Sequence, residues 1–176
     1  MTVNLEKLES KLVRPFAAAA LLSVCAAFAQ GTLAAGTGNG NDQYTWSAEL
    51  VSFDQASKTL TAKVRVDNPA DVQSLHLMKG DPITLTWTGI TWGAGIRGVA
   101  RGHEASASAD ALTLPAQYVG TDSEDNYITF QVPVPSASIS KIQALKPVDW
   151  ITATSRRQAA DPNAAVVAIR GYNDVS

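Results

Sequence analysis

The stretch Leu77–Thr86, LMKGDPITLT, decides the fold, because a second copy, LKPVDWITAT, occupies Leu145–Thr154. The second copy begins 68 residues after the first, and the same offset aligns Ser47–Thr86 with Pro115–Thr154 without a gap. Identical pairs include Asp54 with Asp122, Asp81 with Asp149 and Ile83 with Ile151. Self-similarity at a fixed offset is the signature of a repeated structural unit. The sequence therefore predicts one small unit that is used twice.

The hydrophobic pattern predicts that each unit has the order β-β-α-β-β. In the second predicted strand Leu60, Ala62, Val64 and Val66 alternate with polar residues, which indicates one buried face. The sequence Asn68-Pro69-Ala70-Asp71 is typical of a helix start, and we expect that helix to reach about Met78 and to end at Gly80. The other strands of the first unit are Tyr44–Phe53, a strand opened by Asp81 with Ile83, Leu85 and Trp87 on one face, and Ile96–Arg101.

The second unit repeats this plan. Its predicted elements are the strands Thr113–Thr121 and Asn126–Val134, a helix over Ser136–Leu145, and the strands Asp149–Thr154 and Val166–Arg170. Pro133 cannot donate a hydrogen bond to a neighbouring strand, so we expect its strand to lie at a sheet edge. The last strands, Val99–Gly102 and Ala168–Gly171, match at an offset of 69.

The size of the units predicts that they fold together. A unit of ~60 residues buries only ~60% of the surface of its unfolded chain and is marginal alone. We therefore expect a mainly β fold in which repeats at 44–102 and 112–176, joined by a linker at 103–111, form one pseudo-symmetric barrel. Two abutting small barrels, OB-like or SH3-like, are the alternative topology.

The stretch Leu77-Met78-Lys79-Gly80-Asp81, between a short helix and a strand, resembles the GD-box of the cradle-loop barrels. Those barrels, which include double-psi barrels, are built from a duplicated β-β-α-β unit. The second copy departs from the motif, since Val148-Asp149 stands in place of Gly-Asp. The resemblance implies a pseudo-twofold β-barrel and no particular function, because such barrels serve many.

The N-terminus is typical of an export signal. Lys7, Lys11 and Arg14 precede the apolar run Phe16–Ala29, and Ala27-Phe28-Ala29 is a small-x-small cleavage pattern. We expect a signal peptide at 1–29, a flexible leader at 30–43 and a periplasmic or secreted mature chain with no stable membrane span. Cys25 is the single cysteine, and Val24 before it does not suit a lipidation signal.

Composition excludes some classes of function. The formal net charge is −2, and the sequence has no long basic run, so the electrostatic signature of nucleic-acid binding is absent. Removal of the signal would also remove the only cysteine, so the mature chain would have neither a disulfide nor a thiol nucleophile. No cofactor motif is present: the G-x-G-x-x-G at Gly93–Gly98 lies between two predicted strands, where a loop explains it.

The first functional hypothesis is a non-enzymatic binding or accessory protein of the bacterial cell envelope. Its partner would be an envelope protein, a glycan or a small ligand. Candidate binding residues are Trp92 in the glycine-rich loop Gly89–Gly95, Trp150, and the cations Arg97, Arg156 and Arg157. A surface loop accounts equally well for the Arg156-Arg157 pair.

Two alternatives remain open from the sequence. His76 and Met78 supply imidazole and thioether, which are ligands that copper(I) favours, so a small periplasmic copper carrier is one of them. The other is a hydrolase in which Asp81 and Asp149 form a carboxylate pair, although duplicated turns explain these residues without catalysis.

Overall fold

The computed structural model describes residues 43–88, 95–103 and 111–174, which lie within one compact unit. The predicted signal peptide, Cys25, the predicted leader apart from Gln43, Trp92 and most of the predicted linker fall outside the described residues.

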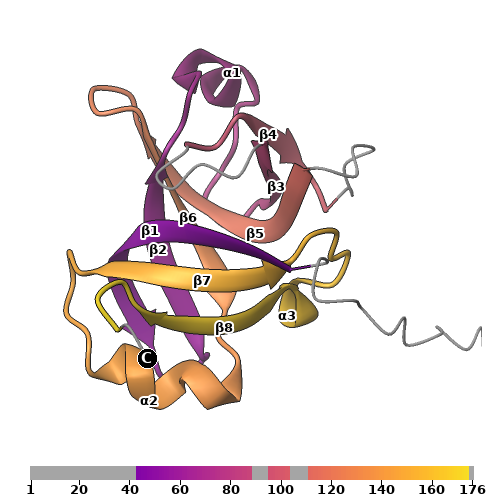
Figure 1. Ribbon diagram of the computed structural model, residues 1–176. Coiled ribbons are helices and arrows are strands. Elements are labelled where there is room, and N and C mark those ends of the chain that lie inside the picture. Colours follow the sequence, from indigo (N-terminus) through magenta and orange to yellow (C-terminus); the bar gives the residue numbers. More distant parts are fainter. Residues whose placement is uncertain (1–42, 89–94, 104–110, 175–176) are drawn as a thin grey trace, which may run out of the picture. The chain divides into compact units, whose positions relative to one another are not determined.

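One eight-stranded antiparallel sheet dominates the described part of the chain (Figure 1), which confirms a mainly β fold. Its strands are β1 (Gln43–Asp54), β2 (Thr59–Arg65), β3 (Pro82–Thr88), β4 (Gly98–Arg101), β5 (Ala111–Asp122), β6 (Tyr127–Pro133), β7 (Trp150–Arg156) and β8 (Val166–Gly171). Their order across the sheet is β4-β3-β5-β6-β2-β1-β7-β8.

The strands of the two predicted repeats are interleaved in this sheet. Strand β3 pairs with β5, with Ile83 opposite Ala116, and β7 pairs with β1, with Ile151 opposite Ala48. In the centre β2 pairs with β6, with Ala62 opposite Phe130. The residue ranges 44–102 and 112–176 thus contribute to one sheet, and two self-contained barrels with separate sheets are not what the described strands form.

The sheet curls, so that segments next to distant strands meet. Ile96, just before β4, bridges Val66, just after β2, although three strands separate β4 from β2 in the sheet order. Backbone hydrogen bonds of 2.8 and 2.9 Å fix this contact, from Ile96 N to Arg65 O and from Asp67 N to Ile96 O. A second bridge joins Thr113 of β5 to Gln158, just beyond β7.

The predicted inward faces are confirmed and enclose one hydrophobic core. The alternating sets on β2 and β6 are buried, as are Ile83, Leu85 and Trp87 of β3. The Trp46 ring stacks on Trp87 with centroids 5.7 Å apart and lies 5.9 Å from Phe130. The buried indole N–H of Trp46 donates to Ser155 Oγ of β7 at 2.8 Å. The polar group of the largest side chain of β1 therefore has a hydrogen-bond partner.

A β-bulge interrupts each of the long first strands. The register shifts between Leu50 and Ser52 in β1 and between Tyr118 and Gly120 in β5. Before the bulge the even-numbered residues of β1 face the core, and after it Phe53 packs against the core instead. An extra residue reverses the alternation, since side chains in a strand repeat every two residues.

Three short helices and one 3₁₀ turn complete the described fold. Helix α1 (Pro69–Ser74) and helix α2 (Ile139–Gln143) lie at opposite ends of the molecule in Figure 1, and each buries one apolar residue, Val72 and Ile142. The 3₁₀ helix η2 (Ser136–Ser138) precedes α2, and α3 (Pro162–Ala165) precedes β8. Helix α3 was not predicted, although Asp161 caps it and Pro162 begins it.

The structure corrects two sequence expectations. Helix α1 ends at Ser74 rather than near Met78, because His76 adopts a left-handed conformation with φ of 48° that an α-helix cannot contain. Strand β6 is central, so the edge position expected from Pro133 is wrong. Pro133 is tolerated because it is the last residue of β6 and lies beyond Gln131, where pairing with β5 begins.

Replacing Ser155 with alanine removes the hydroxyl that accepts from the buried indole N–H of Trp46. We expect Ser155→Ala to lower the free energy of unfolding by about 1–3 kcal/mol, because an unsatisfied buried donor bears its full desolvation cost. Urea unfolding followed by tryptophan fluorescence measures this. The control Ser52→Ala changes an exposed residue of β1 and should stay within about 0.5 kcal/mol of the wild type. Equal stability of the two variants would contradict the prediction.

Candidate functional site

Two similar turns lead into β3 and β7, and each is closed by a hydrogen bond to an aspartate side chain. In the first, Asp81 Oδ2 accepts from Met78 N at 2.9 Å; in the second, Asp149 Oδ2 accepts from Lys146 N at 2.7 Å. Each turn also bonds to a neighbouring strand, through Gly80 N to Tyr118 O and Val148 N to Leu50 O. The two carboxylates are therefore occupied in their own turns, which accounts for both residues without an acid–base pair.

The two turns differ in the residue that adopts positive φ. Gly80 has φ of 94°, whereas the corresponding Val148 has φ of 74°. Glycine takes this conformation at no steric cost, but a β-branched residue is strained in it. The Val148 side chain is 69% exposed, so burial does not offset the strain. Strain of this kind in native proteins is concentrated at functional sites.

The turns differ also in the residue on the neighbouring edge strand. Arg101 of β4 lies opposite Ile83, and its guanidinium binds Asp81 Oδ2 at 2.9 Å. The same guanidinium donates to the carbonyl oxygens of Leu75 and His76. In the second turn Gly171 of β8 lies opposite Ile151. Arg101 and Gly171 are 70 residues apart, so the offset of 69 expected for the last strands is wrong by one.

A surface hollow of about 710 Å³ lies beside the second turn. We call it the Trp150 hollow. Its walls come from β1, the Asp149 turn, the start of β7 and the chain after β8, and include Ser47, Leu145, Asp149, Trp150, Tyr172 and Asp174. Gly171 lines it as well, and a Cβ there would come within 3.1 Å of Leu145 Cδ2. The same Cβ would come within 3.2 Å of Asp174 Oδ2, so Leu145 and Asp174 already pack against Gly171 and leave no room for a larger residue.

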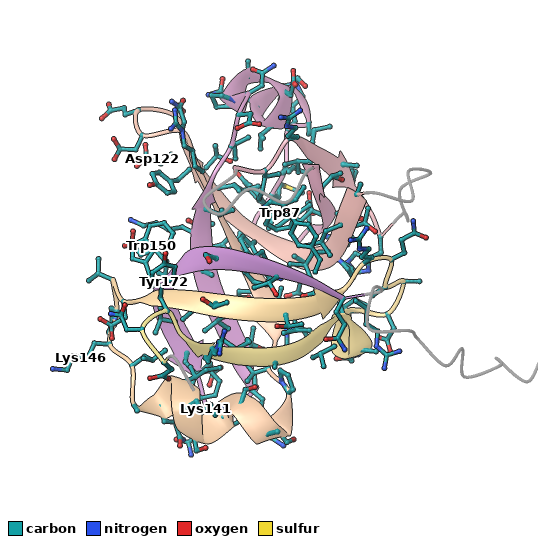
Figure 2. All side chains as sticks on the ribbon, viewed as in Figure 1. Trp87, Asp122, Lys141, Lys146, Trp150 and Tyr172 are labelled. Atoms are coloured by element: carbon teal, nitrogen blue, oxygen red, sulfur yellow. The ribbon has the colours of Figure 1, made fainter. Side chains whose placement is uncertain are left out.

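Two aromatic side chains stand side by side on this hollow (Figure 2). Tyr172 N donates to Trp150 O at 2.8 Å, and Ile151 lies opposite Gly171, so Trp150 and Tyr172 are cross-strand neighbours on the same face. Trp150 is 45% exposed and Tyr172 is 49% exposed. The sequence prediction that Trp150 is available for contact is consistent with this placement.

The charges around the hollow are mainly negative. Asp149 and Asp174 line it, and no described Lys or Arg side chain forms an ion pair with either carboxylate. Glu49, opposite Trp150 on β1, is already bound to Lys63 at 3.0 Å, and this hydrogen bond raises the pKa of Lys63. Arg170 donates to the Asp174 backbone oxygen at 3.3 Å, while Figure 2 shows Lys146 extending away from the two aromatic rings.

The three predicted arginines lie elsewhere. Arg97 is 3.6 Å from Asp67, near the bridge between Ile96 and Val66. Arg156 is the last residue of β7, at the opposite end from Trp150. Arg157 follows it, and its Nε is buried without a hydrogen-bond partner. Burial raises the pKa of the nearby Tyr44, and the positive charge of Arg157 opposes that shift. The structure therefore does not bring these cations to Trp150.

The candidate copper ligands lie on the exposed segment after α1. His76 is exposed, its backbone oxygen accepts from Arg101, and Met78 is 70% exposed. Within the described ranges no group of three or more His, Cys, Asp or Glu residues is placed to hold a metal ion. His103 lies at a separate hollow of about 200 Å³, where Nε2 is 3.3 Å from Ala116 O.

Sequence reasoning missed most of the hollow. No sequence motif links Trp150 with Ser47, Tyr172 and Asp174, which lie far from it in sequence. These residues meet through the pairing of β7 with β1 and β8. A usable signal was the departure at Val148-Asp149 from Gly80-Asp81, which marks the turn that forms one wall.

Comparisons with known proteins show no family for this chain. No family model matches the sequence, and no curated protein matches it. One similar solved structure is a siderophore utilization protein from T. fusca, with 11% sequence identity and a TM-score of 0.30. The alignment covers 67% of this chain and 46% of that one, so this chain spans less than half of its length. At this TM-score the likeness carries no argument about function.

Across residues 43–88, 95–103 and 111–174, no helix has the length and apolar character that crossing a membrane requires.

Exchanging the residues at positive φ tests the strain in the second turn. We expect Val148→Gly to raise the free energy of unfolding by about 1 kcal/mol, since the left-handed conformation costs an L-residue ~1–2 kcal/mol and glycine adds some unfolded-state entropy. The reverse change, Gly80→Val, should lower it by about 1–2 kcal/mol, because no atom lies within 4 Å of the added Cβ and the effect is conformational. Thermal unfolding measures both, and a destabilised Val148→Gly protein would refute the strain.

Proposed function

We propose that this chain is an exported, non-enzymatic ligand-binding protein of the bacterial cell envelope and that the Trp150 hollow is its binding site. The observation that carries the proposal is a hollow of about 710 Å³ with two adjacent exposed aromatic rings. Ligand sites typically have volumes of ~300–1,000 Å³ and combine aromatic walls with a few polar groups. The hollow has this composition, since Ser47 and two carboxylates accompany Trp150 and Tyr172.

The exposure of the two rings supports a binding role over a purely structural one. Aromatic side chains contribute much of the energy of protein interfaces and cores when they are buried. Trp46 and Trp87 follow that rule, whereas Trp150 and Tyr172 are held at the surface by backbone pairing of β7 and β8. An exposed aromatic pair next to a strained turn is typical of a binding surface.

The architecture that we propose for this module is a duplicated, pseudo-symmetric barrel of β-β-α-β-β units. Three features support it. The pair of Ile83 and Ala116 has a counterpart in the pair of Ile151 and Ala48, in which each residue is replaced by its equivalent 68 positions away in the other half. The bulges recur at the same offset, and Ala62 faces its own counterpart Phe130. The Ile96–Val66 bridge supports closure of the curled sheet. A duplicated scaffold allows one copy of a turn to keep a structural role while the other acquires a ligand.

Export is tested by the mature N-terminus. We expect that the full chain, expressed in a bacterium with an outer membrane, is recovered from the periplasm with Gln30 as its first residue, because Ala27-Phe28-Ala29 fits the signal peptidase pattern. Intact mass spectrometry of the periplasmic fraction measures this. Ala27→Arg, with a large charged residue in the small-residue position, should retain the precursor. Accumulation of an uncleaved chain in the cytoplasm would contradict export.

Binding at the hollow is tested by the indole N–H signals of ¹⁵N-labelled protein. The probes form a fixed panel: N-acetylglucosamine, glucose, acetate, L-argininamide and L-citrullinamide. We expect at least one probe to shift the Trp150 signal saturably while the buried Trp46 and Trp87 signals stay in place. Trp150→Ala should remove the binding without unfolding the protein, since that ring is exposed. If no probe shifts Trp150, the proposed site is wrong.

A further inference from the structure

We infer that the Trp150 hollow binds a guanidinium group carried by its ligand, through the Asp149 carboxylate and the faces of Trp150 and Tyr172. This inference rests on the proposed function and adds the chemical class of the ligand. It comes from comparing the two aspartate turns within the chain, one of which already binds a guanidinium.

The first turn shows how this backbone arrangement holds a guanidinium. Arg101 Nη1 is 2.9 Å from Asp81 Oδ2, the same oxygen that accepts from Met78 N. Arg101 Nη2 donates to Leu75 O at 2.9 Å and to His76 O at 3.1 Å. A charge-assisted contact and two carbonyl contacts make use of the fork of donors that arginine presents. The guanidinium therefore joins the turn, the end of α1 and β4.

The second turn keeps the acceptor and lacks the donor. Asp149 Oδ2 accepts from Lys146 N as Asp81 Oδ2 accepts from Met78 N, so the carboxylate is held in the same way. The position opposite Ile151 is Gly171, where the position opposite Ile83 is Arg101. The chain thus supplies no guanidinium of its own from this position. Leu145 and Asp174 pack against Gly171 instead, and Asp149 lines the hollow.

The aromatic pair adds a second kind of attraction for a cation. The face of a tryptophan or tyrosine ring attracts a guanidinium within ~6 Å, and arginine also stacks on such rings through its planar group. In the first half the residues that pair across the strands at the corresponding place are Pro82 and Gly102, neither of which is aromatic. Trp150 and Tyr172 are therefore a feature of the half that lacks the internal arginine.

The surrounding charges favour a cation over an anion or a neutral group. Asp149 and Asp174 both line the hollow, whereas no Lys, Arg or His is among the described residues that line it. Arg170 approaches from the side and contacts the backbone oxygen of Asp174 rather than a carboxylate. Glu49 is paired with Lys63 and adds little net charge. A ligand guanidinium would give Asp149 the partner that Arg101 gives Asp81.

The experiment compares L-argininamide with L-citrullinamide, which has nearly the same shape and no charge on its side chain. With purified protein, the shift of the Trp150 indole signal during titration gives the dissociation constant. We expect this constant to be at least tenfold lower for argininamide than for citrullinamide, and 0.5 M salt to weaken the binding of argininamide. Asp149→Asn removes the charge but keeps an oxygen that can accept from Lys146 N. This variant should weaken the binding of argininamide at least fivefold. Asp81→Asn is the matched control and should leave this affinity unchanged, since Arg101 occupies that turn.

A second variant keeps the inference testable if Asp149→Asn proves unstable. Asp174→Asn changes the other carboxylate that lines the hollow and should weaken the binding of argininamide at least twofold. The capped peptide acetyl-Gly-Arg-Gly-amide separates the sources: tighter binding than argininamide indicates an arginine of a partner chain, and equal binding indicates a small molecule. Either result supports a guanidinium ligand.

Two outcomes separate this inference from the proposed function. If argininamide and citrullinamide bind alike, or if a neutral sugar shifts Trp150 while argininamide does not, the guanidinium inference is overturned and the hollow remains a binding site. If neither amide nor any other probe of the panel shifts Trp150, both fail together.

Discussion

The pairing of β1 with β7 and of β3 with β5 is the constraint on which the rest of the structure depends. Each of these pairs joins a strand from one half of the sequence to a strand from the other half, so neither half completes its sheet alone. Units of ~60 residues have too little interior to be stable by themselves, and the exchange of strands gives them a shared core. That core contains the stacked rings of Trp46 from β1 and Trp87 from β3, and Phe130 of β6 lies against Trp46.

The same pairing places the candidate site. Strand β7 lies between β1 and β8, which brings Ser47, Trp150 and Tyr172 to one surface, and the Asp149 turn enters β7 at that point. The two aspartate turns have the same hydrogen bonds but different neighbours: a guanidinium from Arg101 in one and the bare backbone of Gly171 in the other. A single position on each edge strand thus distinguishes the two turns, since Arg101 binds the Asp81 carboxylate and Gly171 has no side chain that could bind Asp149.

The sequence predicted the elements in which hydrophobic and polar residues alternate regularly. It failed where a local change of backbone geometry interrupts that regular pattern. Alternation on β2 and β6 predicted their buried faces, and Trp87 was correctly expected on one face with Ile83 and Leu85. The bulge in β1 was not foreseen, because an extra residue leaves no compositional trace. The end of α1 was misplaced, since the left-handed turn at His76 comes from tertiary contacts, including the Arg101 bond to its carbonyl, rather than from helix-breaking residues.

By itself the sequence determined the mainly β class, the strand positions and the existence of two similar turns, because alternation and self-similarity are local properties of the chain. It also named Trp150, together with Trp92, as a candidate for an exposed contact. Only the tertiary structure decided that the strands of the two halves share one sheet, that Gly171 stands where Arg101 stands in the other half, and that Tyr172 and Asp174 join Trp150 around a hollow. The physical reason is that strand pairing and the walls of a hollow depend on residues far apart in sequence, and a local pattern does not record them.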